Sequence, residues 1–216
     1  MKNLKIMSFN LGKKFVPVKY SNKREVVSKF LLDQDCDVIL LQGEKIKYNI
    51  WLDSLKEKYL YVEKGKAMTL IKKEIQAFPE NHLTGPNNVV FYSFRKPFVS
   101  VNVNCKKMSD MKDVLSICKN YSDPDSPFYV PNRIIGGRFP NEFHQEEFCD
   151  RLDLNDLSTS IAPHTHERNN RAMVNHLFIS RNLSSDQVYK NVGIVEVSKI
   201  GEAYPIEAKI ILQKTR

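Results

Sequence analysis

The chain has 216 residues, 42% of which are hydrophobic, and it carries a formal net charge of +8 at pH 7. A chain of this length and composition can bury one sizeable core, so we expect a single domain over residues 1–216. No apolar stretch approaches the length of a membrane span, so we expect none. The excess of Lys and Arg attracts polyanions such as nucleic acid. The lysines are also scattered along the chain, which is typical of a solvated basic surface.

Cysteine usage indicates a cytoplasmic protein. The four cysteines lie far apart and form no CxxC pair: Cys36, Cys105, Cys118 and Cys149. The first residues, MKNLKIMSFNL, are too short and too mixed for the apolar region of a secretory signal. We therefore expect reduced, buried thiols in a cytoplasmic location.

The first part of the chain predicts two buried strands and two helices. The apolar run Leu4–Leu11 ends at a glycine and predicts a strand, and Val38–Gln42 predicts a second one. Between them, Ser21 or Asn22 can cap a helix that has one apolar face. The segment Ile50–Tyr59 predicts a short helix.

The middle of the chain changes to short β-prone runs separated by turn residues. This spacing predicts antiparallel strands. The runs are Met68–Ile71, Ile75–Phe78, Val89–Phe94 and Phe98–Val103. A helix is expected at Asp110–Tyr121, followed by a proline-rich loop at Ser122–Pro131.

The last part begins with the segment IIGGRFPNEF, in which an apolar run enters two glycines and then an arginine. The segment Asn141–Leu152 predicts a helix, and LDLNDLSTS predicts the turn after it. Three strands follow, at Val174–Ser180, Val192–Val197 and Tyr204–Leu212. Strands interrupted at intervals by helices favour an α+β fold, with mixed sheets in a sandwich and helices on its outer faces.

Six segments on or beside these predicted strands form an ordered series. They read LKIMSFNLG, DVILLQGE, VSVNVNCK, IIGGRF, VNHLFIS and GEAYPIEAKI. The series spans Leu4 to Leu212 and resembles the endonuclease/exonuclease/phosphatase superfamily, whose strand endings read N, LQE, NxHL, GDFN, IDxI and SDHxP. The resemblance implies a four-layer α/β/β/α sandwich of two mixed, mostly antiparallel sheets. It also implies a relation to metal-dependent phosphoesterases and nucleases.

Of the four residues that carry the chemistry in the first four motifs, one is kept in place and three are changed or displaced. Asn10 matches the family asparagine. The metal-binding glutamate of LQE falls on Gly43, and Glu44 lies one residue later, so its side chain turns to the other face unless a bulge restores it. The histidine of NxHL falls on Lys106, and the aspartate of GDFN falls on Arg138.

The last two motifs are changed as well. The aspartate of IDxI falls on Asn175, and the SDH sequence becomes Gly201, Glu202 and Ala203. The resemblance therefore carries the degenerate catalytic positions to Asn10, Glu44, Asn175 and Glu202.

These changes remove the groups that the family chemistry needs. Metal-assisted phosphodiester hydrolysis requires oxygen ligands for Mg²⁺ and a base for the attacking water. Arg138 can neither bind a cation nor accept a proton, and Lys106 adds a second positive charge. Our hypothesis is that Arg138 and Lys106 replace the metal as the positive charge of a phosphate-binding cleft, paired with Glu44 and Glu202. No cofactor is expected, and Glu44 is the one candidate for a metal ligand.

Three functions stay open from the sequence. The first is an inactive or impaired homologue that binds nucleic acid, a phosphorylated ligand or a protein partner through a basic cleft. The second is an active Mg²⁺-dependent phosphodiesterase or nuclease that uses the four degenerate positions with a base from the HxH pair, His164 and His166. The third is an interaction protein whose cleft is filled. His176, inside a predicted strand, is expected to make structural hydrogen bonds.

Overall fold

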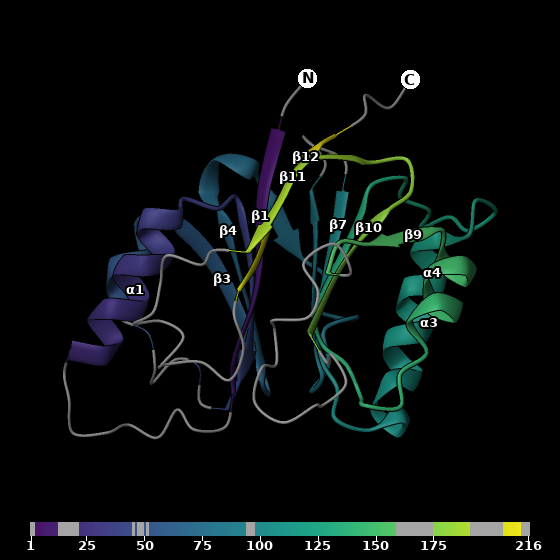
Figure 1. The fold of residues 1–216 in the computed structure, drawn as a ribbon, viewed down its shortest axis with the longest axis horizontal. Coiled ribbons are helices and arrows are strands. Elements are labelled where there is room, and N and C mark those ends of the chain that lie inside the picture. Colours follow the sequence, from purple (N-terminus) through teal and green to yellow (C-terminus); the bar gives the residue numbers. More distant parts are fainter. Residues whose placement is uncertain are drawn as a thin grey trace.

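The computed structural model describes residues 3–12, 22–44, 46, 50, 52–93, 98–158, 175–190 and 205–212. These residues form two six-stranded sheets that pack face to face (Figure 1). The first sheet has the order β11-β12-β1-β2-β4-β3 and the second has the order β5-β6-β7-β8-β10-β9. Each sheet contains one parallel pair, β1 with β2 and β7 with β8, and its other pairs are antiparallel.

The strands of the first sheet are β1 (Asn3–Gly12), β2 (Val38–Gly43), β3 (Tyr59–Lys64), β4 (Ala67–Lys72), β11 (Ser184–Lys190) and β12 (Ile206–Ile211). Those of the second sheet are β5 (Ala77–Pro79), β6 (Asn88–Ser93), β7 (Phe98–Asn104), β8 (Arg133–Arg138), β9 (Leu154–Asp156) and β10 (Asn175–Ser180). The helices are α1 (Asn22–Gln34), α2 (Leu52–Lys56), α3 (Met111–Ser122) and α4 (Gln145–Leu152), with short 3-10 turns at Lys73–Ile75 and Met108–Asp110.

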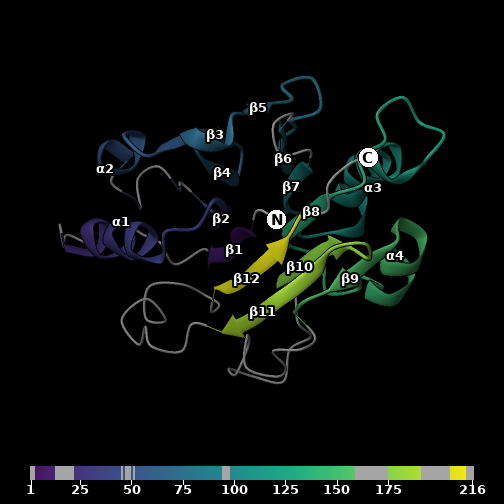
Figure 2. The same ribbon diagram turned by 90° about the horizontal axis from the view of Figure 1, so that it is seen from above.

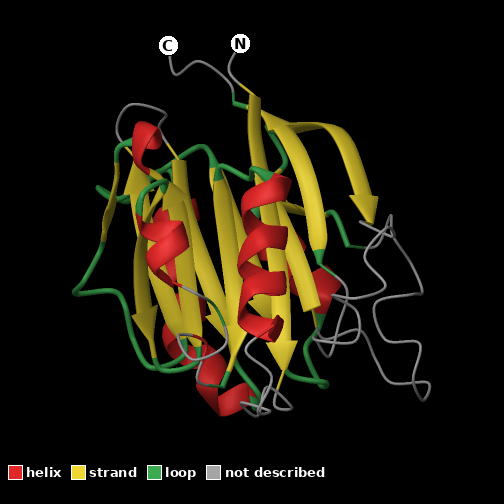
Figure 3. Ribbon diagram, turned by 90° about the vertical axis from the view of Figure 1, so that its left-hand side faces the viewer, coloured by secondary structure: helices red, strands yellow, loops and turns green. Residues whose placement is uncertain are grey.

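The helices cover the outer faces of the sandwich. Seen from above, α1 and α2 lie outside the first sheet, and α3 and α4 lie outside the second (Figure 2). Figure 3 shows the first pair in front of its sheet. Alternating side chains along each strand supply an inner core between the sheets, which includes Ile6, Leu40 and Ile134, and an outer core under each helix pair. The predicted α/β/β/α sandwich is therefore confirmed.

The two sheets repeat one topology. In the first half of the chain, β1, α1, β2, α2 and the β3–β4 hairpin follow one another, and β7, α3, β8, α4 and the β9–β10 pair repeat this order in the second half. Each half also contributes one antiparallel pair to the sheet of the other half. The β5–β6 pair of the first half joins the second sheet through β7, and the β11–β12 pair of the second half joins the first sheet through β1. This pseudo-twofold arrangement places the carboxyl ends of β1, β2, β7 and β8 at the same end of the sandwich.

Three predicted elements differ in extent from the observed ones. The helix expected at Ile50–Tyr59 is limited to α2, because Tyr59 is buried and begins β3, where its hydroxyl donates to the carbonyl of Cys36 at 3.0 Å. The helix expected from Asn141 begins at Gln145, because Pro140 and Phe143 close a turn first. The strand expected at Ile75–Phe78 begins only at Ala77, because Ile75 ends a 3-10 turn and Gln76 follows it with a left-handed φ of +55°.

Three strands were not predicted from the sequence. The strand β3 follows directly on the expected helix, β9 lies within the segment expected to be a turn, and β11 has the polar sequence SSDQVYK. All three are edge strands, so pairing with one neighbour holds each of them in place. The strand expected at Val192–Val197 lies outside the described residues.

The cysteines and the helices agree with two further expectations. All four cysteines are free and buried, as expected for small apolar fillers. In the part of the chain that the structure describes, no helix combines the length and the apolar character needed to cross a bilayer.

Candidate phosphate-binding site

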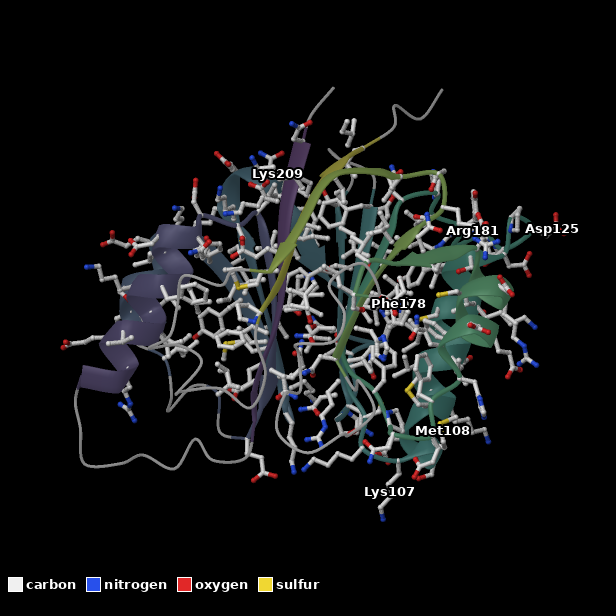
Figure 4. The ribbon with its side chains drawn as sticks, in the orientation of Figure 1. Lys107, Met108, Asp125, Phe178, Arg181 and Lys209 are labelled. Carbon is white, nitrogen blue, oxygen red and sulfur yellow. The ribbon has the colours of Figure 1, made fainter. Side chains whose placement is uncertain are left out.

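The candidate site lies at the end of the sandwich where β1, β2, β7 and β8 terminate. Contacts between the sheets join these ends: Asn10 donates to the Asn175 side chain at 2.9 Å, and Gln42 donates to the Asn102 side chain at 2.8 Å. In Figure 4 this is the lower end of the molecule, marked by Lys107, which follows β7. The order of the strands thus gathers positions that are far apart in the sequence.

Two lysines share one carboxylate at this end. Glu44 Oε1 accepts from Lys66 Nζ at 2.8 Å and from Lys106 Nζ at 3.2 Å. The side chains of Lys106, Glu44 and Lys66 are 31%, 41% and 45% exposed, so a solute can reach all three. Because exposed ion pairs contribute little to stability, a bound anion can replace these contacts at low cost.

The lysine ammonium groups hold the Glu44 carboxylate in its charged form. Hydrogen bonds from Lys66 and then Lys106 lower the pKa of Glu44 to about 2. The bond to Glu44 raises the pKa of Lys66, whereas desolvation lowers that of Lys106, with the neighbouring Lys66 adding to the effect. The pKa values of the two lysines shift in opposite directions because Lys106 is more buried and because both cations compete for one acceptor.

A glycine and a bulge bring Glu44 to the lysines. The β1–β2 register shifts between Asn10, opposite Gln42, and Gly12, opposite Gly43. Gly43 has a φ of +150°, in a region that favours glycine, and its N–H donates to the carbonyl of Lys66 at 2.9 Å. This backbone places Glu44 beside Lys66, although Glu44 lies one residue beyond the family position.

A row of three polar side chains crosses the second sheet next to this cluster. Arg138 lies directly opposite Asn104 on β7 and opposite Asn175 on β10. Residues paired in this way point to the same face of a sheet. Leu177 lies two residues from Asn175 and Ile134 lies four residues from Arg138, so each shares the face of its polar neighbour. Both belong to the core between the sheets, and the row therefore faces inward.

Two donors in this row lack partners among the described residues. Arg138 Nε and Asn175 Nδ2 are buried atoms with no hydrogen-bond acceptor. Asn175 is only 3% exposed, so its free N–H group cannot be satisfied by bulk water at the surface. The charge of Arg138 also acts on Lys66. The row therefore presents donors without a carboxylate.

The second glycine before Arg138 is required by close backbone packing. A Cβ on Gly137 would lie 1.9 Å from the carbonyl oxygen of Val103, and its φ is +139°. Gly136 faces inward, where a Cβ would meet Leu40 Cδ1 at 2.7 Å. The two glycines allow β8 to pack tightly while it delivers Arg138 to the site.

Comparison with known proteins identifies the fold. No family model matches the chain, and no curated protein matches it. Among solved structures, the endonuclease/exonuclease/phosphatase from Bacteroides vulgatus has a TM-score of 0.69 at 13% identity and covers 99% of this chain and 100% of its own. The chain has the fold of the endonuclease/exonuclease/phosphatase superfamily.

Two further structures with this superfamily fold have more specific descriptions. D. rerio TDP2, complexed with single strand DNA product, has a TM-score of 0.65 at 13% identity, with 98% of this chain and 100% of that one covered. The catalytic domain of human nocturnin, with a bound sulfate anion, has a TM-score of 0.68 at 12% identity, with 98% and 95% covered. These structures confirm the fold that the six sequence segments imply.

The described residues do not fit the divalent metal of the endonuclease/exonuclease/phosphatase superfamily. They contain no group of three or more His, Cys, Asp or Glu side chains that could hold a metal ion. Glu44 is bound by two lysines, and Asn10 and Asn175 face each other in a hydrogen bond. Mg²⁺ prefers several oxygen ligands in octahedral geometry, and this set of residues does not offer them.

The structure brings together five of the candidate residues and their neighbours. Asn10 and Asn175 are bonded, Glu44 and Lys106 are paired, and Arg138 lies in the same row as Asn175. No contact between Arg138 and Glu44 is found among the described residues. The remaining candidates, Glu202 and the histidines at 164 and 166, lie outside the described ranges.

Two residues of the site, Lys66 and Asn104, are not predicted by the sequence patterns. Lys66 stands among the turn residues before the expected strand Met68–Ile71, and its position opposite the end of β2 depends on the β2–β4 pairing. Asn104 precedes the changed histidine motif, and its side chain donates to the carbonyl of Lys66 at 2.6 Å. The asparagine of the NxHL motif was the available signal for its role in orienting the loop that carries Lys66.

His176 lies outside this site, on the outer face of the second sheet. Its Nδ1 is 2.7 Å from Asp156 Oδ2, and Ser158 Oγ also bonds Asp156. The ring stacks on Phe178 at a centroid distance of 5.2 Å. Its contacts are structural and connect β9 to β10.

Proposed function

We propose that this chain is a catalytically impaired protein of the endonuclease/exonuclease/phosphatase fold that binds phosphate groups in its cleft without a metal. The observation that carries the proposal is the charge of the site. Two cations, Lys66 and Lys106, pair with one carboxylate, Glu44, and the charge of a third cation, Arg138, acts on Lys66. The excess positive charge stands where the superfamily pattern places acidic ligands and a histidine.

The side chains of the site support binding more than hydrolysis. Lysine and arginine donate hydrogen bonds to phosphate oxygens and accept no proton from water. Asn10 and Asn175 are neutral amides, so they can orient a ligand but cannot act as general bases near neutral pH. Since loss of several cooperating catalytic groups leaves little activity, we propose that turnover is low or absent.

The ligand class follows from the same charges. A pocket with excess lysine and arginine attracts nucleic acid and phosphorylated small molecules, with an affinity that falls as salt rises. The D. rerio TDP2 structure holds a DNA product and the human nocturnin structure holds sulfate, which are both anionic ligands. We propose the same chemical class for this chain.

A second candidate, an Mg²⁺-dependent phosphodiesterase, is favoured by one observation. Glu44 has a pKa of about 2 and is therefore an ionised carboxylate at neutral pH. An ionised carboxylate is a suitable ligand if a divalent cation displaces the two lysines. The test of the proposal must therefore include metal binding.

The test combines calorimetry with binding and activity assays. The purified protein is titrated with Mg²⁺ and Mn²⁺, and nuclease and phosphodiesterase activities are assayed with each metal. Binding of a fluorescent single-stranded oligonucleotide is then measured in EDTA at several salt concentrations. We expect no turnover and a metal-independent, salt-sensitive binding that Arg138→Gln weakens about tenfold or more. Arg151→Gln, on the outer helix α4, is the matched control and retains full binding.

Two results would overturn the proposal. Turnover that depends on a divalent metal and is abolished by Glu44→Ala would show a rebuilt active site. Absence of any anion binding would show that the cleft is filled and would favour an interaction protein.

A further inference from the structure

We propose that the site prefers a phosphate monoester, with two negative charges, over an internal phosphodiester with one. This inference rests on the proposed function, since it requires that the cleft binds phosphate. The preferred ligand is then a terminal phosphate, either at the end of a nucleic-acid strand or on a small molecule. The argument depends on the charge of the site and on its free donors.

The charge of the described site matches a dianion. Lys66, Lys106 and Arg138 contribute three positive charges, and Glu44 removes one. Asp110 lies in the 3-10 turn after β7, and its Oδ2 accepts from the backbone N–H groups of Lys106 and Lys107 at 3.3 Å each. A phosphate monoester carries about 1.5 to 2 negative charges at pH 7. A phosphodiester leaves more of the positive charge unbalanced.

The arrangement of the hydrogen-bond donors suits the three free oxygens of a terminal phosphate better than an internal phosphodiester. Arg138 and Asn175 pair directly across the neighbouring strands β8 and β10. Arg138 Nε and Asn175 Nδ2 have no hydrogen-bond partner among the described residues. Asn175 is held by Asn10 across the sheets, which fixes the direction of its amide. The lysines approach from the loops after β7 and before β4. A terminal phosphate offers three free oxygens to these groups, whereas a diester offers two.

Burial gives the two ligands different access. Asn175 is 3% exposed, whereas Lys66, Lys106 and Glu44 are partly exposed. A chain end can approach a buried donor from one side, but an internal phosphodiester carries substituents on both sides. Steric access and charge therefore favour the same ligand.

The inference predicts a specific pH dependence. The second pKa of a phosphate monoester is about 6, so the ligand loses one negative charge as the pH falls below that value. Glu44 has a pKa of about 2 and stays ionised over this range. Lysine and arginine side chains keep their charge at these pH values. Monoester binding should therefore weaken between about pH 7.5 and pH 5, and diester binding should change less.

The experiment compares matched ligands on the full-length protein. Oligonucleotides of one sequence, with and without a 5′-phosphate, are measured by fluorescence anisotropy in EDTA. Methyl phosphate and dimethyl phosphate then compete against the bound probe. We expect at least about a tenfold preference for each monoester, since one added charge-assisted hydrogen bond accounts for that factor. Competition by methyl phosphate alone would identify the small molecule as sufficient, and a need for the strand would identify a nucleic-acid end.

Variants separate the site from general surface charge. Arg138→Gln should remove most of the preference, and Lys106→Gln provides a second, partly exposed position if the first variant folds poorly. Lys119→Gln, exposed on α3, is the control for net charge. Equal binding of monoester and diester would overturn this inference while leaving phosphate binding intact. Binding of neither ligand would overturn both this inference and the proposed function.

Discussion

The two ends of the β2–β4 strand pair carry the same kinds of charged residue in different proportions. At one end, Lys72 Nζ lies 2.9 Å from Asp35 and 3.1 Å from Asp37, and Lys58 also pairs with Asp35. Two lysines thus face two aspartates, which we call the balanced cluster. Hydrogen bonds from Lys58 and then Lys72 lower the pKa of Asp35.

At the other end the proportions are unequal. Glu44 faces Lys66 and Lys106, and Arg138 adds a further cation. The balanced cluster satisfies its charges internally, as expected of a structural ion-pair cluster. The unbalanced cluster has excess positive charge, and two donors beside it lack partners among the described residues, which supports the proposed anion binding. The comparison therefore sets a structural cluster against the proposed binding cluster within one pair of strands.

The largest expected effect is on stability at the balanced cluster. Lys72→Met removes a cation whose side chain is 11% exposed and leaves the Asp37 carboxylate, whose side chain is 14% exposed, with no paired cation and only the hydrogen bond from the Lys5 backbone N–H among its polar contacts in the described residues. Loss of one partner of a buried ion pair costs up to about 3 to 5 kcal/mol, and we expect about 2 to 3 kcal/mol here because Asp35 remains exposed. Urea denaturation measures the loss. The exposed neighbour variant Lys73→Met should be nearly neutral, and reduced phosphate binding by Lys72→Met would show that the two ends are coupled.

The second effect is on binding at the unbalanced cluster. Arg138→Gln should weaken phosphate binding about tenfold or more while changing the free energy of unfolding by less than about 0.5 kcal/mol. Stability is preserved because Arg138 Nε has no partner to lose among the described residues. Anisotropy and urea denaturation of the same preparation give both values. A large loss of stability would show that Arg138 is a structural residue.

The third effect tests the sign of the charge argument. Glu44→Gln removes the one carboxylate that the two lysines share, so we expect binding of anions to become about threefold tighter and more sensitive to salt. Titration at several salt concentrations measures both changes. Glu44→Asp keeps the charge and serves as the control. Weaker binding after Glu44→Gln would indicate that the carboxylate contributes to the ligand site.

The smallest effect concerns acid titration of Glu44. Its folded pKa of about 2 lies below the ordinary value of 4.5, so its contribution to stability is complete above about pH 4.5 and is lost as the pH falls towards 2. Solvent screening keeps this contribution small because the carboxylate is partly exposed. NMR titration of the carboxyl carbon should show the lowered pKa, and Lys66→Gln should raise it. An unshifted titration would mean that the lysines do not hold Glu44 in solution.

Local patterns predicted most of the strands and their order. The apolar runs at Val38–Gln42 and Phe98–Val103 became β2 and β7 because each is buried on both faces. Local sequence patterns did not predict edge strands that are held by pairing with a single neighbouring strand. The polar strand β11 pairs only with β12, and the short β9 pairs only with β10.

Residue type at motif positions also predicts part of the site. It predicts Arg138 and Lys106, because an arginine after two glycines at a strand end is a local feature. It does not predict Lys66, since this partner of Glu44 is 22 residues away in the chain and its position depends on the β2–β4 register. The row that joins Asn104, Arg138 and Asn175 likewise depends on pairing across three strands.

The amino-acid sequence by itself determined the excess of positive charge, the succession of strands and helices, and the replacement of acidic and histidine positions by Arg138, Lys106 and Ala203. Only the tertiary structure decided which of these charges meet. Burial and chain propensity act within a few residues, whereas ion pairs and strand register join residues that are distant in sequence. The unbalanced cluster is therefore a product of the fold acting on residues that the sequence supplies.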